Sequence, residues 1–341
     1  MKKAILKTNL VTYFCRVNSG EIFSINSEQI FNEQALATFK YQAENCAVYK
    51  SYLFHLGVVP EAINQVSDIP YLPISFFKTH HVTSDNSEPE IVFSSSGTTG
   101  VVQSQHFVSA VKVYEDSFNT AYEQFYGKIK DVCLLALLPS YLERDGSSLI
   151  YMVDALLKQS NHAKSGYFLH NHQELFNTLQ QLKLAKQKTI LIGVTYALLD
   201  FLEKHQLSFP ELIVMETGGM KGKRKEMVRE ELHDVLKAGF GVSAIHSEYG
   251  MTELLSQAYS FGNGIFNCPG WMKIVLRETN DPLSLVTTQQ TGGINVIDLA
   301  NINSCSFIAT QDLGRVYAHG SFEVLGRFDH ADIRGCNLLV Q

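Results

Sequence analysis

Between residues 89 and 262, short apolar runs alternate with helix-like stretches, and this alternation constrains the fold more than any other feature of the chain. The apolar runs have the length of strands and are, in chain order, 90–93, 132–138, 189–194, 212–215 and 242–245. The stretches between them have helical spacing and cover 147–158, 173–184, 196–205 and 224–236. Strands separated by helices usually lie parallel in one sheet, so the pattern predicts an α/β fold with helices packed on a mostly parallel sheet.

The segment before this alternation is predicted to be helical. Ser27 is suited to cap a helix, and apolar residues follow it at three- and four-residue spacing: Phe31, Ala35, Phe39, Ala43 and Cys46. We expect one long helix here that ends before Gly57 and Pro60.

The segment after the alternation is rich in Gly, Asn and Thr. Its short strand-like runs, 293–299, 306–309 and 322–325, predict a small, mostly antiparallel β subdomain. The expected organisation is one compact large domain made of four parts: a helical N-terminal region (1–88), an α/β core (89–262), a β subdomain (263–328) and a C-terminal tail (329–341).

Charge and composition exclude several classes of protein. The chain has 28 Lys and Arg against 34 Asp and Glu, a net charge of -6, which argues against a nucleic-acid partner. No apolar run is long enough for a membrane span, and the N-terminal residues do not form a signal peptide, so a cytoplasmic location is expected. The six cysteines include no CxxC pair, which favours reduced thiols over disulfides or a zinc site.

The sharpest motif is Ser-Ser-Ser-Gly-Thr-Thr-Gly at 94–100, directly after a strand-like run. A loop of glycines and hydroxyls in this position can surround phosphate oxygens with N–H and O–H groups. It is not a Walker A loop, because no Lys-Ser/Thr pair follows. The alternative is an ordinary Ser/Gly turn.

Two further motifs follow apolar runs. In the segment 246–253, His-Ser-Glu-Tyr-Gly-Met-Thr-Glu, the carboxylate of Glu253 could hold Mg²⁺ and Thr252 could hydrogen-bond a phosphate. The alternative is a strand-end turn with surface carboxylates. In the segment 216–223, two adjacent glycines would let a flat ligand approach the backbone, and the basic residues after them would attract an anion or simply begin a helix.

The last motifs lie near the end of the chain. Asp312, in Gln-Asp-Leu-Gly-Arg, could accept hydrogen bonds from a ribose diol, and Arg327, in Gly-Arg-Phe-Asp, could bind ribose or phosphate. Taken singly, each could equally be a turn residue or part of a surface ion pair.

The order of these motifs resembles that of the acyl-adenylate-forming superfamily. Within it, the chain is most similar to the LuxE-type acyl-protein synthetases, over residues 25 to 341. Three features carry this narrower resemblance: IPYLPISFFKTH at 69–80, LPSYLERDGSSLIYM at 138–152, and the absence of Pro-Lys after GTTG. The chain also ends just after Arg334-Gly335-Cys336.

The resemblance implies the large-domain fold of acyl-adenylate-forming enzymes, with ATP and Mg²⁺ as cofactors. By motif position, the phosphates would be held by Ser95, Ser96, Gly97, Thr98, Thr99 and Gly100. The adenine would lie beside Gly218, Gly219, Tyr249, Gly250 and Met251. Asp312 and Arg327 would hold the ribose, and Thr252 and Glu253 would act in catalysis, with Glu253 binding Mg²⁺.

The resemblance also implies a departure from the superfamily. Twelve residues follow Asp329, so the usual lid domain and its lysine are not expected, and Lys221 or Lys223 could serve instead. LuxE-type proteins accept the acyl group on a cysteine near the C-terminus, which makes Cys336 the candidate nucleophile, with Arg334 lowering its pKa. The alternative is a buried cysteine in the tail.

The resulting functional hypothesis is an ATP-dependent ligase that activates a fatty acid, or another carboxylic acid, as an acyl-adenylate and transfers it to a protein cysteine as a thioester. An acyl-protein reductase, or another acyl-donor or acceptor subunit, would be its partner. One alternative is an acyl- or aryl-CoA ligase, a carrier ligase or an acyltransferase of a biosynthetic pathway. Another is a subunit that binds nucleotide or acyl groups without catalysis.

Overall fold

The computed structural model describes residues 19–85, 87–95, 102–139, 146–218, 227–286 and 290–328. Its main sheet is twelve-stranded within these residues and has a parallel half and an antiparallel half. In sheet order, the parallel half contains β5 (Gly166–Tyr167), β4 (Cys133–Leu137), β6 (Thr189–Val194), β7 (Ile213–Thr217) and β8 (His246–Tyr249). The α/β fold expected from the alternating pattern is therefore present.

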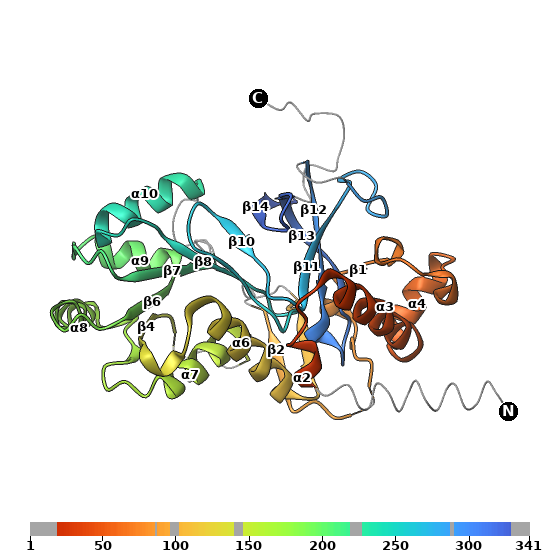
Figure 1. Ribbon diagram of the computed structural model, residues 1–341, viewed down its shortest axis with the longest axis horizontal. Coiled ribbons are helices and arrows are strands. Elements are labelled where there is room, and N and C mark those ends of the chain that lie inside the picture. The colour runs from red at the N-terminus through yellow and green to blue at the C-terminus, as the bar shows by residue number, and fades with distance from the viewer. Residues whose placement is uncertain are drawn as a thin grey trace.

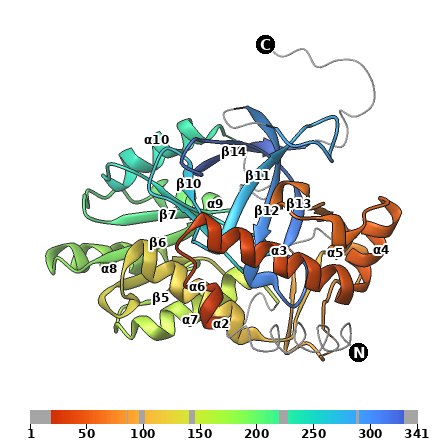
Figure 2. The ribbon, with the colours of Figure 1, turned by 45° about the vertical axis from the view of Figure 1, so that its right-hand side comes forward.

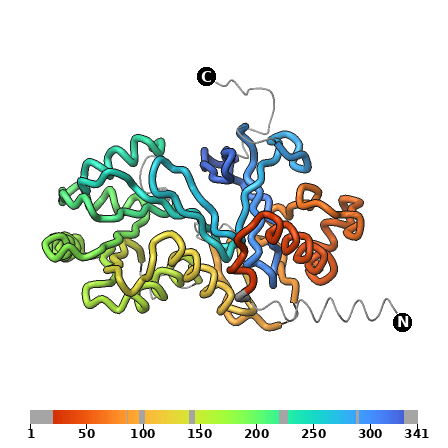
Figure 3. Tube along the Cα trace, in the orientation of Figure 1, coloured from red at the N-terminus to blue at the C-terminus, as the bar shows by residue number. Residues whose placement is uncertain are grey.

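The antiparallel half continues the same sheet from β8. In sheet order, it contains β9 (Ala258–Ser260), β10 (Ile265–Asn267), β14 (Phe322–Arg327), β13 (Phe307–Val316), β12 (Thr291–Asp298) and β11 (Met272–Arg277). Strand β1 (Leu72–Pro73) pairs in parallel with β13, so an early segment lies beside the C-terminal strands, as the tube in Figure 3 shows.

Helices cover both faces of the parallel half (Figure 1). Helices α9 (Thr195–Leu202) and α10 (Arg229–Phe240) lie on one side, and α6 (Val111–Tyr126) and α7 (Ser148–Ser160) lie on the other. Helix α8 (His172–Leu184) precedes β6. Because both faces are covered, every residue of β4 and β6 is buried, as expected for a parallel sheet between helical layers.

The N-terminal segment contributes four helices, of which the two longest pack on the antiparallel half, while the first contacts α6 and the last contacts the strand 105–108. The four helices are α2 (Ser19–Ile22), α3 (Glu28–Asn45), α4 (Ala47–His55) and α5 (Phe76–Thr79). Figure 2 shows α3 lying across β11, β12 and β13. The contact is both apolar and polar, because Phe39 packs against Phe307 and the amide of Gln42 donates to the carbonyl of Asn301 at 2.9 Å. Short 3₁₀ turns cover Pro60–Ala62, Val66–Asp68, Ile129–Asp131 and Leu299–Asn301.

The structure corrects the expectation of one long N-terminal helix. Ser27 caps α3 as predicted, and its hydroxyl accepts the backbone N–H of Ile30. The helix ends at Asn45 because Cys46 adopts an extended conformation, with φ -84° and ψ 103°, and α4 begins at the next residue. The apolar spacing continues across this break, so spacing alone does not reveal it.

Two predicted strands of the parallel sheet are also corrected. The run 90–93 forms β2 (Ile91–Ser94), which pairs with β3 (Gln105–Val108) in a separate antiparallel ribbon. The run 242–245 is not a strand. Gly241 ends α10 in the left-handed conformation, Val242 and Ile245 are buried in the connection, and the strand is the next segment, 246–249.

Helix α6 is missing from the prediction, and its five tyrosine and phenylalanine residues make it strongly aromatic. The predicted runs 132–138, 189–194 and 212–215 form β4, β6 and β7 in the expected order. The helices predicted at 147–158, 173–184 and 196–205 form within a few residues of their predicted bounds. None of the helices in the described ranges is long and apolar enough to cross a membrane.

Candidate active site

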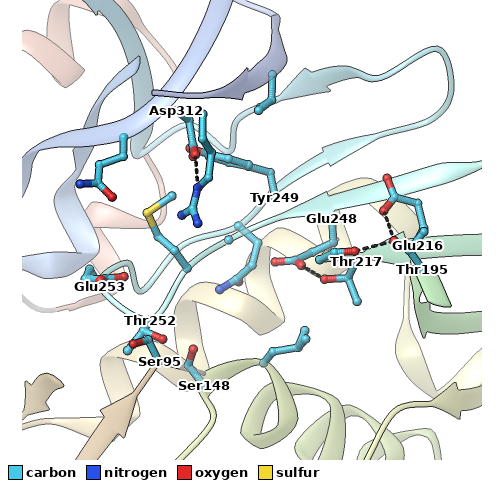
Figure 4. Close-up of a pocket in the computed structure, with 18 of the residues that line it drawn as sticks. Ser95, Ser148, Thr195, Glu216, Thr217, Glu248, Tyr249, Thr252, Glu253 and Asp312 are labelled. Atoms are coloured by element: carbon cyan, nitrogen blue, oxygen red, sulfur yellow. Dashed lines mark hydrogen bonds and ion pairs between the residues drawn. The ribbon is translucent and has the colours of Figure 1, made fainter. Parts of the chain in front are cut away.

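The candidate site is a cleft of about 830 Å³ between the two halves of the sheet. The C-terminal ends of β7 and β8, the start of α7, and strands β13 and β14 contribute its walls (Figure 4). The cleft brings together nine residues that the sequence motifs predict: Ser95, Gly218, Tyr249, Gly250, Met251, Thr252, Glu253, Asp312 and Arg327. Other candidates lie outside the described residues: Ser96, Gly97, Thr98, Thr99, Gly100, Gly219, Lys221, Lys223, Arg334 and Cys336.

One wall of the cleft is built around the carboxylate of Asp312, which is 5% exposed. The hydroxyl of Tyr249 donates to its Oδ2 at 2.9 Å, and Nε of Arg327 donates to its Oδ1 at 3.0 Å. The Arg327 pair follows from the register of β13 and β14, in which the two residues are directly opposite. Burial, and then the nearby Asp312, raise the pKa of Tyr249, so this tyrosine remains a neutral donor.

A second carboxylate, that of Glu253, lies in the same cleft and is 6% exposed as a residue. Burial raises its pKa, whereas the hydroxyl of Ser104, which donates to it, and the charges of Arg327 and Lys78 act in the opposite direction. Ser104 is held in turn by Ser95, whose hydroxyl accepts the Ser104 N–H at 2.9 Å. The Ser/Gly motif and the Tyr-Gly-Met-Thr-Glu motif therefore meet at Glu253.

Buried polar groups behind the cleft hold the backbone around Glu253 in place. Asn301 donates to the carbonyl of Glu253 at 2.7 Å, and Asp298 accepts the N–H groups of Leu255 and Ser256, each at 2.9 Å. Such a network costs little to maintain because each donor there has an acceptor. It gives the segment that carries Glu253 a defined position.

His106 of β3 belongs to the same scaffold. Its Nδ1 donates to the carbonyl of Thr252 at 3.0 Å, and its Nε2 lies 2.9 Å from the hydroxyl of Ser304. Burial lowers the pKa of His106 to about 4, so the ring is neutral at pH 7. A neutral ring with a proton on Nδ1 can accept the Ser304 hydroxyl on Nε2, which satisfies both nitrogens.

The other wall of the cleft carries Glu216 and Glu248 at the ends of β7 and β8. Thr217 donates to Oε2 of Glu248 at 2.5 Å, and Thr195 donates to the carbonyl of Gly218 at 2.5 Å. Burial, with a smaller contribution from Glu216, raises the pKa of Glu248 to about 7, although the Thr217 hydroxyl acts against the shift. The end of β7 at Gly218 was expected beside the adenine, whereas the carboxylates of Glu216 and Glu248 were not foreseen as binding groups.

Comparisons with known proteins identify the family. The family model described as "Acyl-protein synthetase, LuxE" matches residues 19–341. The chain belongs to this family.

Individual relatives match this LuxE-family chain over only part of its length or at low sequence identity. The long-chain-fatty-acid–luciferin-component ligase of Photorhabdus luminescens is 36% identical over 75 residues, which cover 22% of this chain and 64% of that protein, less than two thirds of its length. Among solved structures, 2-hydroxyisobutyryl-CoA ligase in its postadenylation state with 2-HIB-AMP has a TM-score of 0.67 at 13% identity, covering 89% of this chain and 68% of that one. ATP-bound MatB from Rhodopseudomonas palustris has a TM-score of 0.52 at 17% identity, covering 69% and 47%. These likenesses confirm the predicted fold class.

Several cleft residues were missed by the motif analysis. Lys78 of α5 lines the cleft, and it belongs to the segment 69–80, which was used only as a mark of resemblance. Glu248 is inside a recognised motif, but its carboxylate was classed with surface groups in the alternative reading. The sequence contained a clue to Lys78 and Glu248, because a charged side chain next to an apolar run has a more constrained position than one in a loop.

The site can be tested for its fit to Mg²⁺. No group of three or more His, Cys, Asp or Glu side chains suited to a metal occurs among the described residues. Mg²⁺ commonly uses one or two carboxylates together with substrate phosphates and water. Glu253 offers one such carboxylate inside the cleft, which fits a magnesium ion that arrives with a nucleotide.

Proposed function

We propose that this LuxE-family protein uses ATP to convert a carboxylic acid into an acyl-adenylate and then passes the acyl group to a protein thiol. The observation that carries the proposal is the cluster of Tyr249, Asp312 and Arg327 in one cleft with Glu253. The residues that we assign to the ribose and to the magnesium of a nucleotide are thus in the same cavity. The family assignment supports the same chemistry.

In the first step, a carboxylate oxygen of the acid attacks the α-phosphorus of ATP. The bond from this phosphorus to the bridging oxygen of pyrophosphate breaks, and pyrophosphate leaves. Asp312 would orient the ribose by accepting hydrogen bonds from the ribose hydroxyls. Ser95 and Thr252 would contact the phosphates. A magnesium ion held by Glu253 would neutralise phosphate charge.

Lys78 is the candidate for a further positive charge at this step. The two lysines expected to replace a lid lysine, Lys221 and Lys223, lie outside the described residues. Lys78 reaches the cleft from α5, and its charge acts on the carboxyl group of Glu253. A cation here would stabilise negative charge that develops on the phosphates.

In the second step, a thiolate attacks the acyl carbonyl carbon. The bond from this carbon to the phosphate oxygen breaks, and AMP leaves with the electron pair. We assign the thiol to Cys336, which lies outside the described residues. Burial raises the pKa values of Cys46, Cys133, Cys268 and Cys305, and a raised pKa makes a cysteine a poor nucleophile at pH 7.

Long-chain fatty acids are the first candidates for the acid, because the Photorhabdus relative is named for them. The test is the intact mass of the protein after incubation with MgATP and a panel of carboxylic acids, together with acid-dependent exchange of pyrophosphate into ATP. We expect exchange, and a hydroxylamine-labile gain in mass equal to one acyl group.

Variants separate the two steps. Cys336→Ser should abolish the gain in mass but keep the exchange, and Cys268→Ser is the matched control that should keep both. Exchange without acylation of the wild type, combined with release of AMP only when CoA is added, would support a CoA ligase instead. Nucleotide binding without any exchange would support a non-catalytic subunit.

A further inference from the structure

Strand β8 presents its side chains alternately to two different surroundings. Successive residues of a strand point to opposite faces of the sheet. Tyr249 therefore points toward Asp312, whereas Glu248 points to the other face, together with Thr217, its direct neighbour on β7. In Figure 4, Glu248 and Thr217 lie away from Asp312 and Glu253.

The face that carries Glu248 looks toward α6 and α7. Tyr114 of α6 and Ser148 and Met152 of α7 line the same cleft. The Tyr114 hydroxyl is already used, because it donates to the carbonyl of Ser148 at 2.9 Å. This compartment is on the opposite side of β8 from Tyr249, so it is separate from the surface on which an adenine would stack.

Gln257 meets Glu248 at this compartment. It is 4% exposed, lines the cleft, and its Oε1 has no hydrogen-bond partner among the described residues. A Cβ placed on Gly250 would lie 2.4 Å from Oε1 of Glu248 and 3.3 Å from Cγ of Gln257. Both side chains thus approach the backbone of Gly250.

These two groups have unused capacity to accept hydrogen bonds. Glu248 receives one described hydrogen bond, from Thr217, and Oε1 of Gln257 receives none among the described residues. An unsatisfied buried polar atom is unfavourable, because it has lost its hydrogen bonds to water without replacing them. The carboxylate of Glu248 would repel the phosphates of ATP. A ligand that carries a hydrogen-bond donor would instead satisfy both Glu248 and Gln257.

We propose that Glu248 and Gln257 bind a hydrogen-bond donor, a hydroxyl or an ammonium group, on the chain of the acid that is adenylated. The inference rests on the proposed function and narrows it. The substrate is then a hydroxy acid or an amino acid, and an unsubstituted alkanoic acid lacks the group that this compartment recognises.

The test compares matched acids. Butanoic, hexanoic and hexadecanoic acids are each assayed beside their 2-, 3- and 4-hydroxy and amino derivatives, using pyrophosphate exchange with the wild type, Glu248→Leu and Glu248→Gln. We expect the wild type to prefer one substituted acid over its parent by at least about 10-fold, since the unsubstituted acid lacks a hydrogen bond to a charged group. Glu248→Leu should remove this preference, and Glu230→Gln, an exposed position on α10, should keep it.

The two substituents are told apart by Glu248→Gln. A neutral amide can still bind a hydroxyl group. The variant should therefore still accept a hydroxy acid as substrate and should no longer accept an amino acid. The nucleotide serves as an internal control, and the affinity for ATP should be the same in wild type and both variants.

The results test the inference separately from the proposed function. Exchange that is equal or faster with unsubstituted acids overturns the inference and leaves the adenylation proposal standing. If no acid supports exchange, the adenylation proposal fails, and calorimetric binding of the same acids then decides the inference. Binding of a substituted acid to the wild type but not to Glu248→Leu supports it, and absence of such binding overturns it.

Discussion

The two walls of the cleft treat their carboxylates differently. On the wall formed by β13 and β14, Asp312 is held through both oxygens, by Tyr249 and Arg327. On the wall formed by β7 and β8, Glu248 is held by one threonine, and its neighbour Gln257 has an unpaired amide end. The first wall is complete without a ligand, and the second is not.

Under the two proposals above, the difference corresponds to two kinds of ligand, the nucleotide at the first wall and the acid at the second. A nucleotide has the same ribose and phosphates in every reaction cycle and for every acid, so its wall can be preorganised by contacts within the protein. The acid is what distinguishes one ligase from another, so the groups that select it must keep hydrogen-bonding capacity for the ligand. The following predictions test whether the walls separate these tasks.

The largest effect is expected at Glu253, beside the nucleotide wall. Glu253→Gln should lower the rate of pyrophosphate exchange by about 10²–10³-fold, because it removes the carboxylate assigned to magnesium at the transferred phosphate. Exchange is measured at saturating acid over a range of Mg²⁺ concentrations, with Glu230→Gln as the control. An unchanged rate with an unchanged Mg²⁺ dependence would exclude this role.

The next effect concerns Asp312. Asp312→Asn should raise the KM for ATP by about 10–100-fold, since a charge-assisted hydrogen bond is worth about 1.5–3 kcal/mol. The KM for the acid should stay the same, which is the reverse of the result expected for Glu248→Leu. If both variants change both KM values, the two walls do not act separately.

A smaller effect follows from the titration of Glu248. Its folded-state pKa of about 7 exceeds the ordinary value of 4.5, so the folded protein binds the proton more tightly than the unfolded chain. The associated stability is present at pH 4.5 and is lost as the pH rises through 7. Relative to Glu248→Gln, the wild type should lose about 1–3 kcal/mol of unfolding free energy between pH 5 and pH 8.

The measurement is urea denaturation of both proteins at the two pH values. The groups coupled to Glu248 are Glu216, Tyr114, Tyr126 and Tyr259. The three tyrosines stay neutral between pH 5 and pH 8 because burial raises their pKa values. Asp298, whose pKa is raised to about 6, is not among the groups coupled to Glu248 and contributes to both proteins alike. A difference between wild type and variant that does not depend on pH would contradict a raised pKa at Glu248.

The smallest effect provides a baseline away from both walls. Ser27→Ala removes the N-cap of α3 and should cost about 1 kcal/mol of stability, read as a lower melting temperature. The hydroxyl of Ser27 accepts the N–H of Ile30 outside the cleft, so exchange rates and both KM values should not change. A changed KM would show that α3 influences the site.

Local patterns predicted the parts of this fold in which chain neighbours decide the outcome. Helices α7 and α8 begin where Ser147 and Asn171 can cap them, and β6 has the predicted bounds. The break at Cys46 and the pairing of β2 with β3 depend on packing and partner choice. The observed and the expected arrangements are compatible with the same apolar spacing, so the spacing could not distinguish between them.

The sequence by itself determined the family, the order of the motifs and the candidate nucleotide residues Tyr249, Glu253, Asp312 and Arg327, because phosphate, magnesium and ribose require particular residue types within short motifs. Tertiary structure alone placed three further residues in the cleft. Glu248, Gln257 and Lys78 come from separate segments, and their positions depend on strand register and on the approach of α5. The role of such side chains depends on what lies opposite them in space, and no local pattern contains that information.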